Sequence, residues 1–389
     1  MYKIQILNNI QSKELKRLDK TRYEVSADTV DPTAIIVRSA KMHDMVFGPE
    51  LLCIGRAGAG VNNIPIDRCA DEGIIVFNTP GANAEAVKEL AICAMLLSTR
   101  DILGGIDWVK SIAPEGEDIP ASVEKHKSRF VGPEIMGKTL GIIGLGAIGA
   151  KIGKAAAALG MTVYGYDPYL SVDAAWRLAP KINKANDLAD IYREADFITL
   201  HVPYHKTTHN MINKQSIARM KPGVRIINLA RAELVCDDDM LEALASGHVA
   251  HYVTDFPNSK TADAPGVIAI PHLGASTPES EDNCVSMVCA EIVDYIENGN
   301  IMNSVNMAPV YLMRTSDPRV CVIHDNVPDM IAQITSAISS YGVNIENMIN
   351  ASTKGKIPSY TMLDINELPG GLGDTIRKIS GVIRVRVLT

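Results

Sequence analysis

The chain has 389 residues, of which 47% are hydrophobic and 21% are charged, a composition typical of a globular protein with two or three domains. Its formal net charge of −7 argues against a nucleic-acid partner, because phosphate backbones are bound by basic patches. No stretch resembles a membrane span or a secretory signal, and the seven cysteines are scattered without a C-x-x-C pair. We therefore expect a cytoplasmic protein with no membrane partner, with free thiols, and with neither metal sites nor disulfides.

Short apolar runs alternate with helical segments from the start of the chain to residue 275. Near-continuous apolar strands separated by helices favour parallel sheets that are covered on both faces. Two series of such strands predict two α/β domains. The strands are expected at residues 3–7, 34–38, 52–54 and 74–77 in the first series, and at 139–143, 162–166, 197–202, 225–229, 252–254 and 267–270 in the second.

The segments outside these strands also carry predictions. Residues 84–98 have the pattern of a long helix that links the two series. Residues 105–130 are polar and contain proline and glycine, which predicts a loop or hairpin on the rim of a domain. A helix over residues 279–297 should cross back to the first domain, and residues 303–317 should form a linker.

Residues 138–167 contain a nucleotide-binding pattern. A predicted strand is followed by Gly144, Gly146 and Gly149 at G-x-G-x-x-G spacing, then by an Ala-rich helical segment, a second strand and Asp167. The glycines permit a tight turn, close approach of a pyrophosphate and close packing of helix on strand, and the helix N-terminus attracts phosphate. Asp167 suits the ribose hydroxyls and would repel a 2′-phosphate, so the order of these parts predicts NAD as cofactor.

Two residues at the ends of later strands have the chemistry that hydride transfer needs. Arg231 follows the strand at 225–229, and its planar fork can bind a carboxylate. His272 follows the strand at 267–270, and an imidazole there can act as general acid and base. Ligands of open α/β sheets bind beyond the carboxyl ends of the strands. A surface ion pair for Arg231 and a structural role for His272 remain alternatives at this point.

Several motifs together resemble the D-isomer-specific 2-hydroxyacid dehydrogenases. They read IVRSA, IGRAGAGVNNI, FNTPGAN, GIIGLGAIG, HVPYHKTTHNMIN, NLAR and PHLGAST in chain order, and the resemblance spans residues 1–305. The last 70 residues predict the order βαββαβ, a ferredoxin-like arrangement. With IHDNVP and YGVNIENM, this segment is similar to the ACT domain, a small regulatory domain that binds amino acids.

The resemblance implies an α/β fold with three domains. A Rossmann-type NAD-binding domain at residues 99–275 would be inserted in a flavodoxin-like substrate domain at residues 1–98 and 276–305, each a doubly wound parallel sheet. An ACT domain would occupy residues 318–389. Such domains usually bind their ligand between two copies, so a homo-oligomer, either a dimer or a tetramer, is expected.

The resemblance also assigns roles to individual residues. Arg231 and His272 would be the catalytic pair. The cofactor would be held by Gly144, Gly146, Ala147, Ile148, Gly149, Asp167, Leu229, Ala230, Arg231, Asp255, His272, Gly274 and Ala275. The substrate would face Arg38, Arg56, Ala57, Gly58, Ala59 and Asn78, and the regulatory site would contain His324, Asn326 and Asn344. Local ion pairs are the alternative role for Arg38 and Arg56.

The sequence departs from the family at the third catalytic residue, a Glu that pairs with the histidine. The expected position falls on Ser259 or Lys260, and neither is acidic. We therefore expect the protonated form of His272 to be less favoured than in relatives that have the Glu, because a nearby cation disfavours a second positive charge.

The combination of such a dehydrogenase with an ACT domain implies a substrate. We expect NAD-dependent oxidation of D-3-phosphoglycerate to 3-phosphohydroxypyruvate, the first step of the phosphorylated route to L-serine, with L-serine as a possible effector. Two alternatives remain open. One is oxidation or reduction of another D-2-hydroxy acid, as in glyoxylate or hydroxypyruvate reductases, and the other is a non-catalytic sensor of NAD and amino acids.

Overall fold

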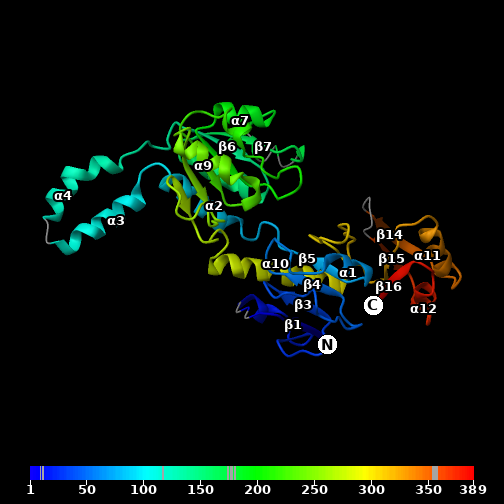
Figure 1. Ribbon diagram of the computed structural model, residues 1–389. Coiled ribbons are helices and arrows are strands. Elements are labelled where there is room, and N and C mark those ends of the chain that lie inside the picture. The colour runs from blue at the N-terminus through cyan, green and yellow to red at the C-terminus, as the bar shows by residue number, and fades with distance from the viewer. Residues whose placement is uncertain are drawn as a thin grey trace. The chain divides into compact units, whose positions relative to one another are not determined.

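The strands of the chain form three sheets within the residues that the computed structural model describes, which are 1–8, 10, 13–115, 118–172, 175, 178, 181–352 and 358–389. The chain divides into two compact units (Figure 1). Met1–Ala82 and Glu281–Thr389 form the first unit, and Asn83–Ser280 form the second.

The first unit contains a parallel sheet of five strands in the order β2-β1-β3-β4-β5. This is the flavodoxin-like doubly wound order, as predicted. Its strands are β1 (Tyr2–Ile6), β2 (Tyr23–Ser26), β3 (Ala34–Val37), β4 (Cys53–Arg56) and β5 (Ile75–Phe77), with helix α1 (Ile66–Asp71) and a 3₁₀ helix at Lys13–Arg17. The prediction missed β2, which is only half buried and has no continuous apolar run.

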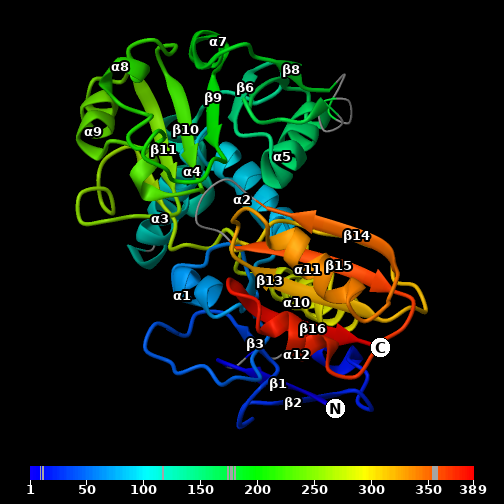
Figure 2. The ribbon, with the colours of Figure 1, turned by 90° about the vertical axis from the view of Figure 1, so that its right-hand side faces the viewer.

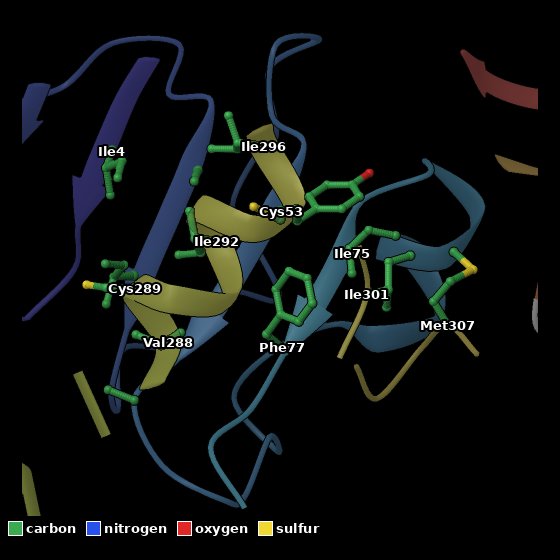
Figure 3. Packing of buried hydrophobic residues seen from close by; sticks show 14 of the residues in the cluster. Ile4, Cys53, Ile75, Phe77, Val288, Cys289, Ile292, Ile296, Ile301 and Met307 are labelled. Carbon is green, nitrogen blue, oxygen red and sulfur yellow. The ribbon is translucent and has the colours of Figure 1, made fainter. Parts of the chain in front are cut away.

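Helix α10 (Pro278–Asn298) packs on this sheet. Gly55 in β4 is the point of closest approach, because a Cβ there would lie 2.1 Å from Val288 and 2.9 Å from Ile292. Val288 and Ile292 lie against Phe77 and Cys53 in the core (Figure 3). The helix predicted at 279–297 is thus confirmed, and it returns to the first sheet.

The second unit contains a parallel sheet of seven strands in the order β12-β11-β10-β9-β6-β7-β8. The strand order reverses between β6 and β9. The carboxyl ends of these two strands therefore mark the topological switch point of a Rossmann-type fold. The strands are β6 (Thr139–Ile143), β7 (Thr162–Tyr166), β8 (Asn183–Lys184), β9 (Phe197–Leu200), β10 (Val224–Asn228), β11 (Val249–Thr254) and β12 (Val267–Ala269). Helices α2 (Ala84–Leu97), α5 (Ala147–Ala158), α7 (Leu188–Glu194), α8 (Lys214–Ile217) and α9 (Asp237–Ala245) and a 3₁₀ helix at Ala232–Leu234 accompany them.

The predicted loop or hairpin at residues 105–130 instead contains helices. Two helices, α3 (Ile102–Ile112) and α4 (Ile119–His126), extend from the second unit (Figure 1), with 3₁₀ helices at Ala113–Glu115 and Lys127–Phe130. Asp101 accepts a hydrogen bond from Gly104 N, and Asp118 accepts one from Ala121 N. Each aspartate therefore caps a helix N-terminus, and the proline that follows Asp118 lies in the first turn, where proline is tolerated.

The third sheet is antiparallel and has the order β14-β15-β13-β16. Its elements are β13 (Arg319–His324), α11 (Met330–Ser339), β14 (Ile345–Ala351), β15 (Ser359–Ile365), α12 (Leu372–Arg377) and β16 (Val382–Leu388). The predicted βαββαβ order is therefore confirmed. One face of the sheet, with Val320, Val322 and Leu363, packs on α11 and α12.

The other face of this sheet packs on the five-stranded part of the first unit. Cys321, Ile323 and Met362 belong to the same buried cluster as Tyr295 and Ile296 of α10. Figure 2 shows β13 and β16 beside α10. Polar contacts reinforce this packing, since the hydroxyl of Tyr360 donates to the Gly299 carbonyl at 2.7 Å. The sheet is thus covered on both faces.

Among the described residues, no helix is both long enough and apolar enough to cross a bilayer.

Candidate active site

The turn between β6 and α5 has the geometry that the glycine motif predicts. Gly144 has φ +96°, and a Cβ there would lie 2.5 Å from the carbonyl oxygen of His201. A Cβ at Gly149 would lie 2.0 Å from the Gly144 carbonyl oxygen. Both positions therefore need glycine for the fold itself. Gly146 is different, because a Cβ there would meet no protein atom within 4 Å, which leaves room for a ligand.

Helix α5 offers a free N-terminus at this turn. Gly146 is its N-cap residue and supplies no side-chain hydrogen bond, and Ala147 and Ile148 form the first turn. Their N–H groups and the helix dipole suit a pyrophosphate. An unhindered Gly146 and an uncapped helix thus fit the phosphates of a dinucleotide.

Asp167 lies at the carboxyl end of β7, beside a cavity of about 610 Å³. Its carboxylate accepts hydrogen bonds from Leu145 N and Tyr169 N, both at 2.9 Å. These bonds fix the side chain and leave lone pairs for ribose hydroxyls. Apolar side chains including Leu145, Leu170 and Ile182 line the cavity, so it fits the adenosine half of NAD.

Arg231 lies just beyond β10, on a loop shaped by Asn228. The Asn228 side chain is fully buried and accepts from Ala230 N at 3.2 Å and from Arg231 N at 3.3 Å. It also donates to the Arg231 carbonyl at 2.8 Å. The guanidinium of Arg231 is exposed and contacts only the Ala230 carbonyl, at 2.6 Å, among the described hydrogen bonds. Buried Leu229 supports the same loop.

His272 lies beyond β12, on a loop shaped in the same way by Asp255. The Asp255 side chain is 1% exposed and accepts from Leu273 N at 2.7 Å and from Gly274 N at 2.8 Å. His272 is exposed, has the left-handed φ of +53°, and packs against Phe256 with ring centroids 4.8 Å apart. The carboxylate of Asp255 thus shapes the loop from His272 to Ala275.

The structure brings Arg231, His272 and the turn that carries Gly144, Gly146 and Gly149, called the glycine turn below, to one edge of the seven-stranded sheet. Arg231 follows β10, His272 follows β12 and Gly144 follows β6, and these strands are parallel. Their carboxyl ends therefore lie on the same side.

Ser259 and Lys260, where the family has its glutamate, are both exposed. Lys260 forms an ion pair with Asp238 at 2.6 Å. Within the part of the chain that the structure describes, no acidic side chain lies within hydrogen-bond or ion-pair distance of the His272 ring. The contact that supports the His272 ring is its packing against the aromatic ring of Phe256.

His201 is a feature of this edge that the sequence prediction missed. It follows β9 at the switch point, and its Nε2 lies 2.8 Å from Thr199 Oγ1. Burial lowers the pKa of His201 from 6.5 to about 3, so the ring is neutral near pH 7. The same rule that pointed to Arg231, a polar residue directly after an apolar strand, would have found it.

We expect His201 to make the second unit less stable in mild acid. Because its pKa is lowered to about 3, the unfolded chain binds a proton between pH 6.5 and 3 that the folded chain does not, so stability falls as the pH falls through this range. His201→Gln should reduce the loss between pH 7 and pH 5 by about 1–2 kcal/mol, measured by urea unfolding. Between pH 7 and 8 the difference between the two proteins should stay constant, and equal losses at pH 5 would contradict the assignment.

The predicted substrate residues lie at the carboxyl edge of the five-stranded sheet. Arg38 follows β3 and pairs with Glu281 at 2.6 Å, which is the local ion pair considered above. Arg56 ends β4, and its Nε donates to the Arg38 carbonyl at 3.1 Å. Asn78 follows β5 and donates to the Ala59 carbonyl at 2.7 Å.

The loop after β4 has an unusual backbone. Gly58 has φ +142°, and a Cβ there would lie 1.6 Å from the Arg56 side chain. Ala57 and Gly58 are buried, while Ala59 is exposed. The structure thus brings all six predicted substrate residues to one edge of the first unit.

The three predicted regulatory residues do not form one site in a single copy. His324 ends β13 opposite Ser359, and Asn326 follows in the next loop. Asn344 precedes β14, whose Ile345 lies opposite Ile365 at the other end of β15. His324 is buried and contacts the Asp325 carbonyl at 2.7 Å and Thr361 Oγ1 at 2.9 Å, whereas Asn326 and Asn344 are exposed.

The second unit is similar to the NAD-binding domain of a known protein family. The family model for "D-isomer specific 2-hydroxyacid dehydrogenase, NAD binding domain" matches residues 92–274. The chain belongs to the D-isomer-specific 2-hydroxyacid dehydrogenase family. The prediction of NAD as cofactor is thereby confirmed, since the matched residues are the family's NAD-binding domain and include the glycine turn, Arg231 and His272.

Relatives in this family are similar over most of the chain. It is 37% identical over 283 residues to D-3-phosphoglycerate dehydrogenase from Bacillus subtilis, which covers 70% of this chain and 51% of that protein. It is 35% identical over 296 residues to the protein of the same name from Methanocaldococcus jannaschii, covering 74% and 54%. The chain thus spans about half the length of these relatives.

A solved structure supports the same assignment. The NAD⁺-bound 3-phosphoglycerate dehydrogenase of Entamoeba histolytica superimposes with a TM-score of 0.61 at 26% identity, covering 78% of this chain and 98% of that one.

Proposed function

We propose that this dehydrogenase oxidises D-3-phosphoglycerate to 3-phosphohydroxypyruvate with NAD. The observation that carries the proposal is the placement of exposed Arg231 and His272 at the same sheet edge as the glycine turn. The names of the relatives support the choice of acid. Because the chain spans only half of the curated relatives, the activity of the whole protein is part of this proposal.

In the proposed reaction the guanidinium of Arg231 binds the substrate carboxylate and orients C2. His272 removes the proton from the C2 hydroxyl as general base. Bound NAD supplies the acceptor for the hydride that leaves C2. Asn228 and Asp255 hold the two loops in place, so the reacting side chains need little rearrangement.

The predicted substrate residues of the first unit include cations that suit a phosphate group. Arg38 and Arg56 are the candidate cations, and at Arg38 the phosphate would replace the carboxylate of Glu281. Guanidinium groups bind phosphate in a bidentate way. The loops that carry Gly58 and Asn78 would complete the substrate site.

We also propose that residues 318–389 form an ACT-type regulatory domain. The βαββαβ order and the strand order β14-β15-β13-β16 support it. Since His324 and Asn326 lie at the opposite end of the sheet from Asn344, an L-serine site would need residues from two copies of a homo-oligomer. Absence of heat on titration with L-serine would exclude this site.

An assay of NADH formation with three additions tests the proposed function. With NAD, we expect NADH absorbance to grow with D-3-phosphoglycerate and to be at least about tenfold slower with D-glycerate, because the phosphate contacts would be missing. Without any acid, no NADH should form. Equal rates with both acids would favour a dehydrogenase for another 2-hydroxy acid, and no rate with any acid would favour a sensor.

A further inference from the structure

A buried carboxyl group lies beneath the proposed substrate loops. Glu291 is on the inner side of α10 and is 8% exposed. Its Oε1 accepts a hydrogen bond from Asn303 Nδ2 at 2.7 Å. Its Oε2 has no hydrogen-bond partner among the described residues. A buried carboxyl with one unpartnered oxygen is costly for a fold, so it calls for a functional explanation.

Asn303 connects this carboxyl to the loop after β5. Its backbone has the left-handed φ of +50°, which directs the carbonyl towards that loop. The Asn303 carbonyl accepts a hydrogen bond from Asn78 N at 3.3 Å, and Phe77 forms a bridge with Ser304. A side chain of α10 is thus joined to the loop that carries Asn78 through one residue.

Asn78 in turn joins the two substrate loops. Its side chain donates to the Ala59 carbonyl at 2.7 Å, and the next residue, Thr79, donates its N–H to the Gly58 carbonyl at 3.1 Å. A continuous series of contacts therefore runs from Glu291 through Asn303 and Asn78 to Ala59.

We propose that Glu291 and Asn303 are positioning residues of the substrate site, and that the neutral form of Glu291 favours binding of the anionic acid. The inference rests on the proposed function. An ionised Glu291 would place a negative charge under loops that are to bind a substrate with several negative charges, and repulsion in the protein interior is strong. A protonated Glu291 removes this repulsion and keeps Oε1 as acceptor for Asn303.

The surroundings of Glu291 allow this protonation near neutral pH. Burial raises the pKa of Glu291 to about 7, and the hydrogen bond from Asn303 opposes the rise. The neighbouring acids on α10 are engaged elsewhere, since Asp294 accepts from Asn298 and Asn300, and Glu297 pairs with Arg22 and Tyr23.

The test compares KM and kcat for D-3-phosphoglycerate between pH 6 and 8.5 in the wild type, Glu291→Gln and Glu297→Gln. Glu291→Gln is neutral at every pH and keeps an acceptor for Asn303. We expect the ratio of wild-type KM to Glu291→Gln KM to rise about fivefold over this range, with similar kcat. Titration of the substrate phosphate affects both proteins equally and cancels. Glu297→Gln, on the same helix, should follow the wild type.

A second variant keeps the inference falsifiable if Glu291→Gln fails to fold. Asn303→Gly removes the amide but tolerates the left-handed backbone, and should raise KM about fivefold at pH 6 with little change in kcat. Parallel KM profiles for the wild type and Glu291→Gln, with turnover intact, would overturn the inference alone. Absence of turnover with any acid in the wild type would instead overturn the proposed function.

Discussion

His272→Asn should lower kcat for D-3-phosphoglycerate by about two to four orders of magnitude, the usual contribution of a general base. The imidazole is exposed at the carboxyl edge of the sheet and is held by the Asp255-supported loop. Asparagine is chosen because this position has φ +53°, which asparagine adopts more readily than most residues. The loop should therefore keep its shape while the proton acceptor is lost.

The control for this prediction is binding of NADH, measured by fluorescence. It should change by less than about threefold in His272→Asn, because the glycine turn and Asp167, which would hold the pyrophosphate and the ribose, lie on other strands of the sheet. A variant that binds NADH normally and retains more than about a tenth of the wild-type turnover would show that His272 is not the proton acceptor.

Arg319→Met should destabilise the first unit by about 3–5 kcal/mol. The guanidinium is fully buried and pairs with Asp364 at 2.6 Å and 3.0 Å. It also donates to the carbonyls of Asn298, Leu312 and Met313. All five N–H groups of the side chain are thereby satisfied. Methionine would leave the buried carboxylate of Asp364 and three backbone carbonyls without this partner, and urea unfolding measures the loss.

Arg377→Met is the matched control for Arg319→Met. Arg377 also pairs with an aspartate, Asp374, but both side chains are exposed and the pair lies within one helix. Its removal should cost less than about 0.5 kcal/mol, because water solvates the separated charges. Similar losses in the two variants would mean that the Arg319 cluster contributes no more than a surface ion pair.

Both α/β sheets and much of the candidate site could be predicted from the sequence, because both follow from short-range patterns. The strand at Thr139–Ile143 is one unbroken apolar run, and the glycines after it have no alternative in that turn. Residues after parallel strands gather at one edge by topology alone, which is why the sequence predicts Arg231 and His272. The roles of Asn228 and Asp255 could not be predicted, since they depend on which backbone N–H groups the loops turn inwards.

The helices at residues 102–126 and the second interface of the C-terminal sheet were not predicted. In α4, Pro120 looks like a break in the sequence, but it lies in the first turn behind the capping Asp118, and both residues are favoured at the start of a helix. In β13 and β15, every residue is buried. Such continuous burial signals that both faces are covered, but it cannot say which distant segment covers the second face.

The double burial of the C-terminal sheet limits how the protein can be divided. Arg384 and Arg386 of β16 donate to carbonyls of Leu51, Tyr295 and Ile296, and the last two belong to the C-terminal turn of α10. Cutting the gene before β13 would leave those carbonyls and the apolar side chains around them in water. A shortened chain would be prone to aggregate, so fusion or domain-exchange experiments should keep this sheet with its parent scaffold.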